Sequence, residues 1–487
     1  MKNKRNIFWN VSVFALLFAA LAVISIGCAS ADTIYVPEEG NQTIQQAVNN
    51  ASEGDTIIVR DAYTGTKENI DVTVAYLTIQ SENGSANCIV NALNSNDHVF
   101  DVQQNYVNVT GFTVENATKN DKAGIHLDSV EHCNISYTNA SNNGCGIWLY
   151  YSSNNILTNN TANSNTRNGI YLSSSSNNTL TNNTASNNNG GICLSSSSNN
   201  TLTNNIMSEN NYNFDVDGSI LSHYTHSIDT SNLVDGEPIY YWIDQQNKEV
   251  PGDAGFVGLV NSTNITVKDL TLTNNQQGVL LAYTKNSRIE RINASNNNWA
   301  GILLYSSSNN TLTNNTASNN IYGIYLQSSS NNNMLTNNTA SSNTRYNIHL
   351  YYSSNNNLFY HNNLINNPNH NAYDTGTNQW NTSTVGNYYS DYTGSDNNSD
   401  GIGETSYPIP GGSSIDCFPL MHPWKEIPPL KGDLDGDFQI TSTDAAIVLE
   451  IAVGSRPCTP ETLAIADVSG DGRVSSLDAL MILQMVT

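Results

Sequence analysis

A four-residue pattern, Gly-Ile-x-Leu, recurs in the middle of the chain and constrains its fold more than any other feature. It begins at Gly146, Gly169 and Gly191, so the repeat is 23 and then 22 residues long. Related versions begin at Gly124, Gly278, Gly301 and Gly323. A fixed period of this length with so few apolar residues predicts a solenoid, because one repeat alone cannot bury its apolar face.

Each repeat contains two short runs of alternating residues, such as 170–172 and 179–181, separated by Ser and Asn. Alternation indicates half-buried strands, and the Ser/Asn clusters indicate turns. Coils stacked about 4.8 Å apart would share one apolar core, and Asn178, Asn200 and Asn310 would form amide ladders between coils. The alternative is a disordered Asn/Ser-rich tract, against which the fixed phase argues. The sequence therefore predicts a mainly β fold, a right-handed single-stranded parallel β-helix.

The composition limits the partners of such a chain. Its 487 residues carry a formal net charge of −24, and only 12% of them are charged. We therefore expect no nucleic acid partner and no binding to an anionic membrane surface. Glycosylation sequons fit an exported glycoprotein, although an Asn/Thr-rich repeat also produces them by chance; examples are Asn108, Asn134, Asn159, Asn182 and Asn314.

The N-terminus has the pattern of an export signal. Lys2, Lys4 and Arg5 precede an apolar run over residues 7–27, and residues 29–31 offer an Ala-x-Ala cleavage site. We expect residues 1–31 to be a signal peptide and the protein to be secreted, extracellular or on the cell surface. A retained N-terminal anchor is the alternative, since the run is long enough to span a bilayer.

The seven cysteines show no metal-binding spacing. In an exported protein Cys133 and Cys145 are a candidate disulfide, and free thiols are the alternative.

The chain divides around the repeats. Residues 32–110 are expected to form an N-terminal cap and irregular first coils, with a strand at 33–36 and a helix within 42–51. Such a cap is required because terminal coils otherwise expose core and strand edges. The repeats occupy residues 111–365 and are interrupted at 214–277, where their phase is lost.

Several segments resemble NosD-like proteins of the pectin-lyase-like β-helix superfamily. They are residues 221–232, 234–242, 386–392, 400–404, 407–411 and 418–421. The resemblance covers roughly residues 33–424 and implies a β-helix with carbohydrate-binding and sugar-hydrolase type repeats. It also implies a C-terminal cap over residues 366–424. The prolines at 423, 428 and 429 then indicate a short, stiff linker at 425–431.

The interruption concentrates carboxylates, imidazoles and aromatic rings. Such groups are required for sugar binding or for acid/base work on a glycosidic bond, and they also occur in an ordinary packed polar loop. The candidate ligand site consists of His223, His226, Asp229, Asp235, Glu237, Tyr240, Tyr241 and Trp242. Asp215, Asp217, Asp244 and Lys248 lie in the same segment.

Catalytic residues are not assigned. Glycosidases of the superfamily use clustered Asp residues, yet between Gly146 and Asn213 the charged side chains are only Arg167 and Glu209. The charges at 285–291 alternate in sign, which is typical of a solvated strand. Copper binding, which the NosD name implies, finds weak support, because the histidines at 349, 361, 370 and 422 share no spacing.

Calcium is the metal that the sequence favours. In the cap, Asp396, Asn398, Asp400 and Glu404 alternate like the oxygen ligands of a Ca²⁺ loop, and an exposed acidic turn is the alternative. A stronger pattern occurs twice near the C-terminus. Side chains at loop positions 1, 3, 5, 9 and 12 and a carbonyl at position 7 provide the oxygens that Ca²⁺ needs. The first set is Asp433, Asp435, Asp437, Gln439 (carbonyl), Thr441 and Asp444; the second is Asp467, Ser469, Asp471, Arg473 (carbonyl), Ser475 and Asp478.

Each loop leads into one apolar helix, and position 12 is Asp rather than the Glu of a standard EF-hand. The duplicated loop–helix unit over residues 432–487 is similar to a type I dockerin, a small α-helical Ca²⁺-binding module. The resemblance implies a cohesin-bearing partner, recognised through loop positions 10 and 11. These are Ser442 with Thr443 and Ser476 with Leu477, and because the pairs differ, we do not expect a fully symmetric dual binding mode.

Three functional hypotheses follow. The first is a secreted β-helix that binds carbohydrate or forms surface structure and docks to a cohesin-bearing partner. The second is a glycoside hydrolase or polysaccharide lyase of a dockerin-assembled complex. The third is a copper-binding protein, as the NosD name implies. The glycan and the individual cohesin partner are not predicted.

Overall fold

The computed structural model describes residues 31–38, 40, 42–425, 430–435 and 439–486. The chain forms two compact units that divide between Pro423 and Trp424. The larger is a parallel β-solenoid and the smaller is helical, so the predicted fold class is confirmed. Most of the expected signal peptide (residues 1–30) and part of the expected linker (426–429) lie outside the described residues.

A short helix lies at the start of the solenoid. Strand β1 (Thr33–Val36) is followed by helix α2 (Ile44–Asn50) and by β2 (Thr56–Val59), which pairs in parallel with β1. Thr43 accepts a hydrogen bond from the backbone N–H of Gln46, whose side chain accepts from the N–H of Thr43. This reciprocal capping box starts the helix. The helix buries Ile44, Ala47 and Val48, as a cap over the first coil requires.

The first part of the solenoid has three parallel sheets. The nine-stranded sheet contains β1, β2, β5 (Thr78–Ser81), β8 (Asn108–Thr110), β11 (Asn134–Ser136), β14 (Ile156–Thr158), β16 (Thr179–Thr181), β19 (Thr201–Thr203) and β22 (Ser227–Ile228). The seven-stranded sheet contains β4 (Ile70–Val72), β7 (Phe100–Val102), β10 (Ala123–Asp128), β13 (Cys145–Tyr150), β15 (Asn168–Ser173), β18 (Gly190–Ser195) and β21 (Tyr212–Asp217). A third sheet contains β3 (Thr66–Lys67), β6 (Ile89–Asn91), β9 (Thr113–Glu115) and β12 (Asn139–Ala140).

Buried asparagines join the coils at the turns. The Oδ1 atom of Asn178 accepts from the backbone N–H of Asn155 at 2.8 Å, and Asn200 does the same for Asn178 at 2.8 Å. The Nδ2 group of Asn178 donates to the Ser152 carbonyl at 3.0 Å and to Asn200 Oδ1 at 3.2 Å. The predicted ladders are confirmed, and they satisfy backbone groups that the turns would otherwise leave unpaired. Parallel ladders run through Asn160, Asn183, Asn205 and Asn232, and through Asn310, Asn333 and Asn357.

The glycine of the repeat is required by close packing between coils. A Cβ atom on Gly169 would lie 2.7 Å from Ala185 Cβ and 2.9 Å from the Ala162 carbonyl oxygen. Real Cβ atoms do not approach other atoms so closely, so any residue other than glycine at this position would force its neighbours to move.

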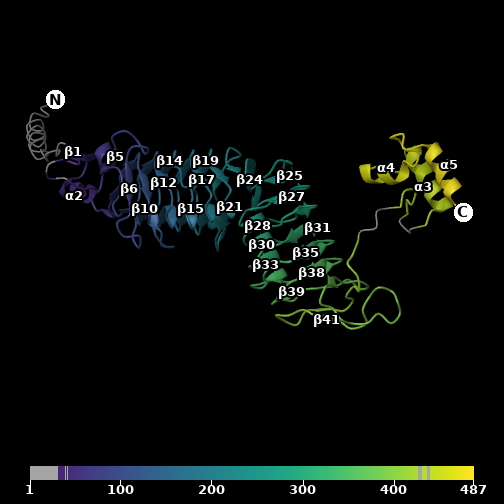
Figure 1. Ribbon diagram of the computed structural model, residues 1–487. Coiled ribbons are helices and arrows are strands. Elements are labelled where there is room, and N and C mark those ends of the chain that lie inside the picture. Colours follow the sequence, from purple (N-terminus) through teal and green to yellow (C-terminus); the bar gives the residue numbers. More distant parts are fainter. Residues whose placement is uncertain (1–30, 39, 41, 426–429, 436–438, 487) are drawn as a thin grey trace, which may run out of the picture. The chain divides into compact units, whose positions relative to one another are not determined.

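The solenoid changes its sheets between residues 214 and 277. Strands β21, β22 and β23 (Leu233–Val234) still extend earlier sheets in parallel, with the short helix η2 (Leu221–Tyr224) between β21 and β22. Strand β24 (Glu237–Ile243) then pairs antiparallel with β23 and starts a new stack. In Figure 1 the stack of coils changes direction at β24.

Three sheets form the second part, and the largest of them also includes two strands of the first part. The ten-stranded sheet contains β17 (Thr184–Ser186), β20 (Ile206–Ser208), β23, β24, β26 (Phe256–Val260), β28 (Gln277–Ala282), β30 (Ala300–Tyr305), β33 (Tyr322–Gln327), β36 (Tyr346–Leu350) and β39 (His370–Asp374). The six-stranded sheet contains β25 (Gln246–Glu249), β27 (Thr263–Lys268), β29 (Arg288–Glu290), β31 (Thr311–Thr313), β34 (Met334–Thr336) and β37 (Leu358–Tyr360). The last sheet contains β32 (Thr316–Ser318), β35 (Thr339–Ser341), β38 (Asn363–Ile365) and β40 (Tyr388–Tyr389), and a hairpin of β41 (Tyr407–Pro408) and β42 (Ile415–Asp416) follows.

The outer face of the ten-stranded sheet closes the open end of the first part. Leu280 and Leu303 belong to the same apolar cluster as the first core, whereas their strand neighbours Val279 and Ile302 belong to the second core. Phe214 meets Phe256 edge to face at 5.1 Å between ring centroids. The strands β28 and β30 are therefore apolar on both faces, as strands buried on both sides must be.

The C-terminal unit is a small helical module. Helices α3 (Ser442–Ala452), α4 (Pro460–Ala466) and α5 (Ser476–Met485) enclose a core that includes Val448 and Ile482. Thr441 and Ser475 cap α3 and α5, and each forms a capping box with the Asp three residues later.

Candidate functional site

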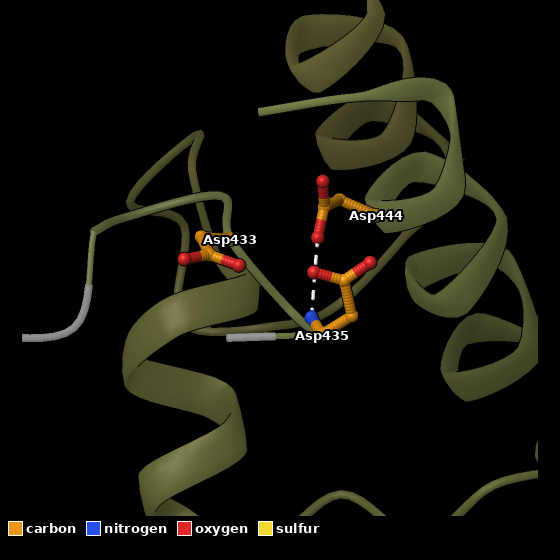
Figure 2. A group of neighbouring side chains, drawn as sticks. All are labelled: Asp433, Asp435 and Asp444. Carbon is orange, nitrogen blue, oxygen red and sulfur yellow. Dashed lines mark hydrogen bonds between the residues drawn. The ribbon is translucent and has the colours of Figure 1, made fainter. Parts of the chain in front are cut away.

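The first C-terminal loop brings three carboxylates together. One oxygen from each of Asp433, Asp435 and Asp444 lies within 4.8 Å of the others. Figure 2 shows that Asp433 and Asp435 come from the loop and Asp444 from the first turn of α3. Carboxylate oxygens that converge in this way suit a hard cation such as Ca²⁺. Asp437 lies outside the described residues.

Asp444 also organises the loop. Its Oδ1 atom accepts from the backbone N–H of Leu434 at 2.7 Å, and its Oδ2 atom accepts from the N–H of Thr441 at 2.8 Å. Burial raises the pKa of this carboxyl, but hydrogen bonds from Thr441, Leu434 and Asp435 outweigh burial and hold the pKa below its usual value. Asp444 is therefore ionised at neutral pH despite its full burial.

In the second loop the helix aspartate again accepts hydrogen bonds from the loop backbone, but three carboxylates are not brought together among its described residues. Asp478 Oδ1 accepts from the N–H of Ser469 at 2.9 Å, as Asp444 does for its own loop. Asp467 instead accepts from the N–H groups of Gly470 at 2.8 Å and Gly472 at 2.9 Å. Among the residues that the structure describes, the trio of the first loop is the only group of three or more His, Cys, Asp or Glu side chains placed to share a metal ion.

The expected partner-binding residues lie at the surface. Ser442, Thr443, Ser476 and Leu477 are all exposed at the start of their helices. Leu477 is 50% exposed, and Leu480 and Leu483 on the same helix are 52% and 46% exposed. An apolar row of this kind on a small domain is typical of a protein-binding surface.

The eight residues of the expected ligand site lie in different environments. His226 is buried and continues an amide ladder, because its Nδ1 atom accepts from the N–H of Asn200 at 3.2 Å. Tyr241 is buried in the first core, whereas Tyr240 and Trp242 pack against the second core, as alternation along β24 requires.

The remaining members lie around this strand. His223 accepts from the N–H of Ser219 at 3.2 Å, and Asp229, Asp235 and Glu237 are exposed. Asp235 accepts from the amide of Asn213 at 2.8 Å. A ligand site formed by all eight residues stays a prediction.

The acidic turn of the cap is closed by its own backbone. Asp396 accepts from the N–H of Gly401 at 2.9 Å, Asp400 accepts from the N–H of Ile402 at 2.9 Å, and Glu404 accepts from the N–H of Asn397 at 2.7 Å. Asn398 donates to Asp400 at 3.0 Å. These bonds account for the turn without an ion, and Ca²⁺ binding here stays a prediction.

A cavity of about 330 Å³, the corner cavity, lies where the two parts of the solenoid meet. The seven-stranded sheet contributes Tyr171, Asp215 and Asp217, and Arg167 lies just before β15. The ten-stranded sheet and its turns contribute Gln276, Gln277, Trp299 and Gln327 on the other side. Burial and the nearby charge of Asp217 raise the pKa of Asp215 to about 7. The sequence placed both carboxylates in the interruption but gave no sign that coils over 60 residues later would face them.

Two protein families match the chain. The family described as "Periplasmic copper-binding protein (NosD)" matches residues 48–234 and 241–394, which is most of the sequence. The chain belongs to the NosD family. The "Dockerin type I domain" matches residues 431–487. No curated protein matches the chain at a significant level.

Some solved structures are similar to this chain at low identity. The A-module of the mannuronan C-5 epimerase AlgE4 from Azotobacter vinelandii is 14% identical, with 74% of this chain and 100% of that chain covered and a TM-score of 0.35. The family 28 exopolygalacturonase of Yersinia enterocolitica is 12% identical, with 72% and 78% covered and a TM-score of 0.36. Neither likeness bears on the activity of this chain.

The copper binding in the family's description finds no fitting set of ligands among the described residues. His98 and His126 stack at 4.1 Å between ring centroids, but His98 Nδ1 accepts from the N–H of Ala123 at 3.0 Å and His126 Nδ1 pairs with Asp101 at 2.8 Å. His226 uses both ring nitrogens in hydrogen bonds. Copper favours clustered imidazole or sulfur ligands, and the trio of the first C-terminal loop is entirely carboxylate.

Two further findings concern membrane spans and cysteines in the described part of the chain. No described helix is long and apolar enough to cross a membrane. Cys133 and Cys145 are both free and buried, so the candidate disulfide between them is not formed.

Proposed function

We propose that this NosD-family protein is a secreted surface protein whose β-helix binds carbohydrate and whose C-terminal module docks to a cohesin-bearing partner when Ca²⁺ is bound. The convergence of Asp433, Asp435 and Asp444 is the observation that carries the proposal. Type I dockerins bind Ca²⁺ in general, and the match over residues 431–487 supports the same role here.

Ca²⁺ would tie the first loop to its helix. Three carboxylates held within 4.8 Å repel one another, and a divalent cation between them converts the repulsion into attraction. The Gln439 carbonyl, Thr441 and Asp437 would complete this set. The second loop would use Asp467, Ser469, Asp471, the Arg473 carbonyl, Ser475 and Asp478, with Asp467 exchanging its bonds to the loop N–H groups for the ion.

Docking would follow from the order that Ca²⁺ gives to both helices. The loop ions fix the starts of α3 and α5, where Ser442, Thr443, Ser476 and Leu477 are exposed. Helix α5 exposes Leu477 and Leu480 where α3 has Thr443 and Ala446, so the two faces differ in apolar area. We expect one face to bind the partner more tightly than the other.

Replacement of Asp433 and Asp467 by alanine tests the calcium step. In Asp433→Ala/Asp467→Ala we expect loss of Ca²⁺ uptake in calorimetry and loss of the helical circular-dichroism signal, with the solenoid still folded. Glu450→Ala is the matched control, because it removes an exposed carboxylate of α3 outside both loops. Ca²⁺ uptake by the double variant at the level of the wild type would refute the assignment.

Retention on immobilised polysaccharide tests the second half of the proposal. We expect the full-length protein to be retained by at least one neutral or acidic polysaccharide without a new reducing or unsaturated end. A polysaccharide-degrading enzyme is the second candidate, favoured by the two carboxyl groups in the corner cavity, Asp215 and Asp217. New ends that disappear in Asp215→Asn would establish that candidate in place of simple binding.

A further inference from the structure

One outward-facing row of the seven-stranded sheet carries aromatic side chains on three successive coils. In the register of the seven-stranded sheet, Asp101, His126, Trp148, Tyr171, Cys193 and Asp215 are aligned on successive coils. The corresponding row of the nine-stranded sheet reads Thr78, Asn108, Asn134, Ile156, Thr179 and Thr201. Apart from Ile156, the second row is short and polar, which suffices for an outer face in water, so the aromatic row needs another explanation.

The rings of this row form a continuous surface along the coils. His126 and Trp148 lie 4.9 Å apart between centroids, and Trp148 and Tyr171 lie 6.1 Å apart with planes inclined by only 23°. His126 is fixed by Asp101, while its Nε2 atom and the Trp148 Nε1 group are buried without a partner among the described residues. Buried polar atoms of this kind are rare, and a ligand is one way to satisfy them.

The aromatic row ends at the corner cavity. Tyr171 lines the cavity on one side and Trp299 on the other, with Asp217 and the side chain of Gln277 between the two sheets. Gln277 is only 2% exposed; its Nε2 group donates to Asp215 at 3.2 Å, and its Oε1 atom has no partner among the described residues. A cavity with aromatic walls and a few fixed polar groups is the usual form of a small-ligand site.

We propose that the aromatic row from His126 to Tyr171 and the adjoining corner cavity bind one chain of a neutral polysaccharide. The proposal rests on the carbohydrate binding proposed above and gives it a site and a substrate class. Ring faces of Trp148, Tyr171 and Trp299 contact the apolar faces of sugar rings. Asp217 and Gln277 then accept hydrogen bonds from sugar hydroxyl groups.

The charge of the cavity selects against acidic sugars. Asp215 and Asp217 both line it, and the chain as a whole carries a net charge of −24. Arg167 is the only cationic residue in its lining, and its guanidinium donates to the Asn120 carbonyl at 3.0 Å. A uronate carboxylate would therefore meet two carboxyl groups and a single guanidinium already engaged elsewhere.

Calorimetry on the full-length protein with purified hexasaccharides tests the proposal. The neutral probes are cello-, xylo-, manno- and maltohexaose, and the acidic probes are hexagalacturonate and hexamannuronate. We expect at least one neutral probe to bind and neither acidic probe to bind. Asp217→Asn and Trp299→Ala should each weaken binding about tenfold or more. Asp217→Asn keeps the size of an exposed side chain, so it tests the site even where Trp299→Ala fails to fold.

Tyr137→Ala is the control, because this aromatic side chain is 62% exposed and lies outside the cavity lining. It should bind the neutral probe as the wild type does. Retention on polysaccharide with unchanged affinity in Asp217→Asn and Trp299→Ala would overturn the site but leave the proposed function standing. Binding of the acidic probes alone would overturn the substrate class. Absence of retention on every polysaccharide would overturn the carbohydrate half of the proposed function as well.

Discussion

Replacement of Asn183 by alanine should destabilise the solenoid more than a typical single substitution does. Asn183 Oδ1 accepts from the backbone N–H and the Nδ2 group of Asn160, both at 3.0 Å. Its Nδ2 group donates to the Leu157 carbonyl at 2.9 Å and to Asn205 Oδ1 at 3.0 Å. A buried donor left unpaired costs about 1–3 kcal/mol, and each further bond contributes about 1 kcal/mol, so we expect a loss of about 4 kcal/mol in the free energy of unfolding.

Urea unfolding followed by circular dichroism measures this loss. The change in midpoint, multiplied by the denaturant slope, gives the change in free energy. Asn189→Ala is the matched control, because Asn189 is partly exposed and accepts one exposed bond, from Asn211 at 3.0 Å. We expect the control to change stability by less than about 0.5 kcal/mol. A value for Asn183→Ala within about 1 kcal/mol of the wild type would refute the role given to the ladders.

Two other predictions use the same urea assay. Gly169→Ala should lower the free energy of unfolding by about 1–3 kcal/mol, because its Cβ would lie 2.7 Å from Ala185 Cβ. Gly252→Ala is the control and should leave stability unchanged, because a Cβ there has nothing within 4 Å. Equal urea midpoints for the two variants would contradict the close-packing argument. Asp215 has a pKa raised to about 7 by burial and Asp217, so the folded chain holds this proton more tightly than the unfolded chain. Its contribution to stability is complete below about pH 4 and is lost as the pH rises toward 7, by up to about 4 kcal/mol. Asp215→Asn should remove this part of the pH dependence, and an unchanged profile would show that Asp215 titrates normally.

The repeat predicted most of the solenoid because its phase carries the packing. Gly169 marks where coils approach closely, and Asn178 and Asn200 mark the ladders. Both follow from sequence spacing, since equivalent positions on stacked coils must meet. The two C-terminal loops were equally predictable from the sequence, because the ligands of a Ca²⁺ loop lie close together in the chain.

The corner between the two parts of the solenoid was not predictable from spacing. It depends on the antiparallel pairing of β23 with β24, which reverses one strand without any marker in the repeat. Leu280 and Leu303 could have indicated the corner, since a β-helix surface exposed to water would carry polar residues at these outward positions. His226 was placed in the candidate ligand site, and not in the amide ladder, for a related reason. Helix η2 displaces it from the repeat phase, which hid its equivalence to the asparagines of the ladder.

Capture by cohesin modules tests whether the C-terminal module docks in a calcium-dependent way. A panel of immobilised type I cohesin modules is exposed to the full-length protein in millimolar Ca²⁺ and again after chelation, with Asp433→Ala/Asp467→Ala and Glu450→Ala alongside. We predict capture of the wild type and of Glu450→Ala by at least one cohesin in Ca²⁺, its loss on chelation, and no capture of the double variant. Capture that survives chelation, or no capture by any cohesin in Ca²⁺, would contradict the account of the C-terminal module as a calcium-dependent tether.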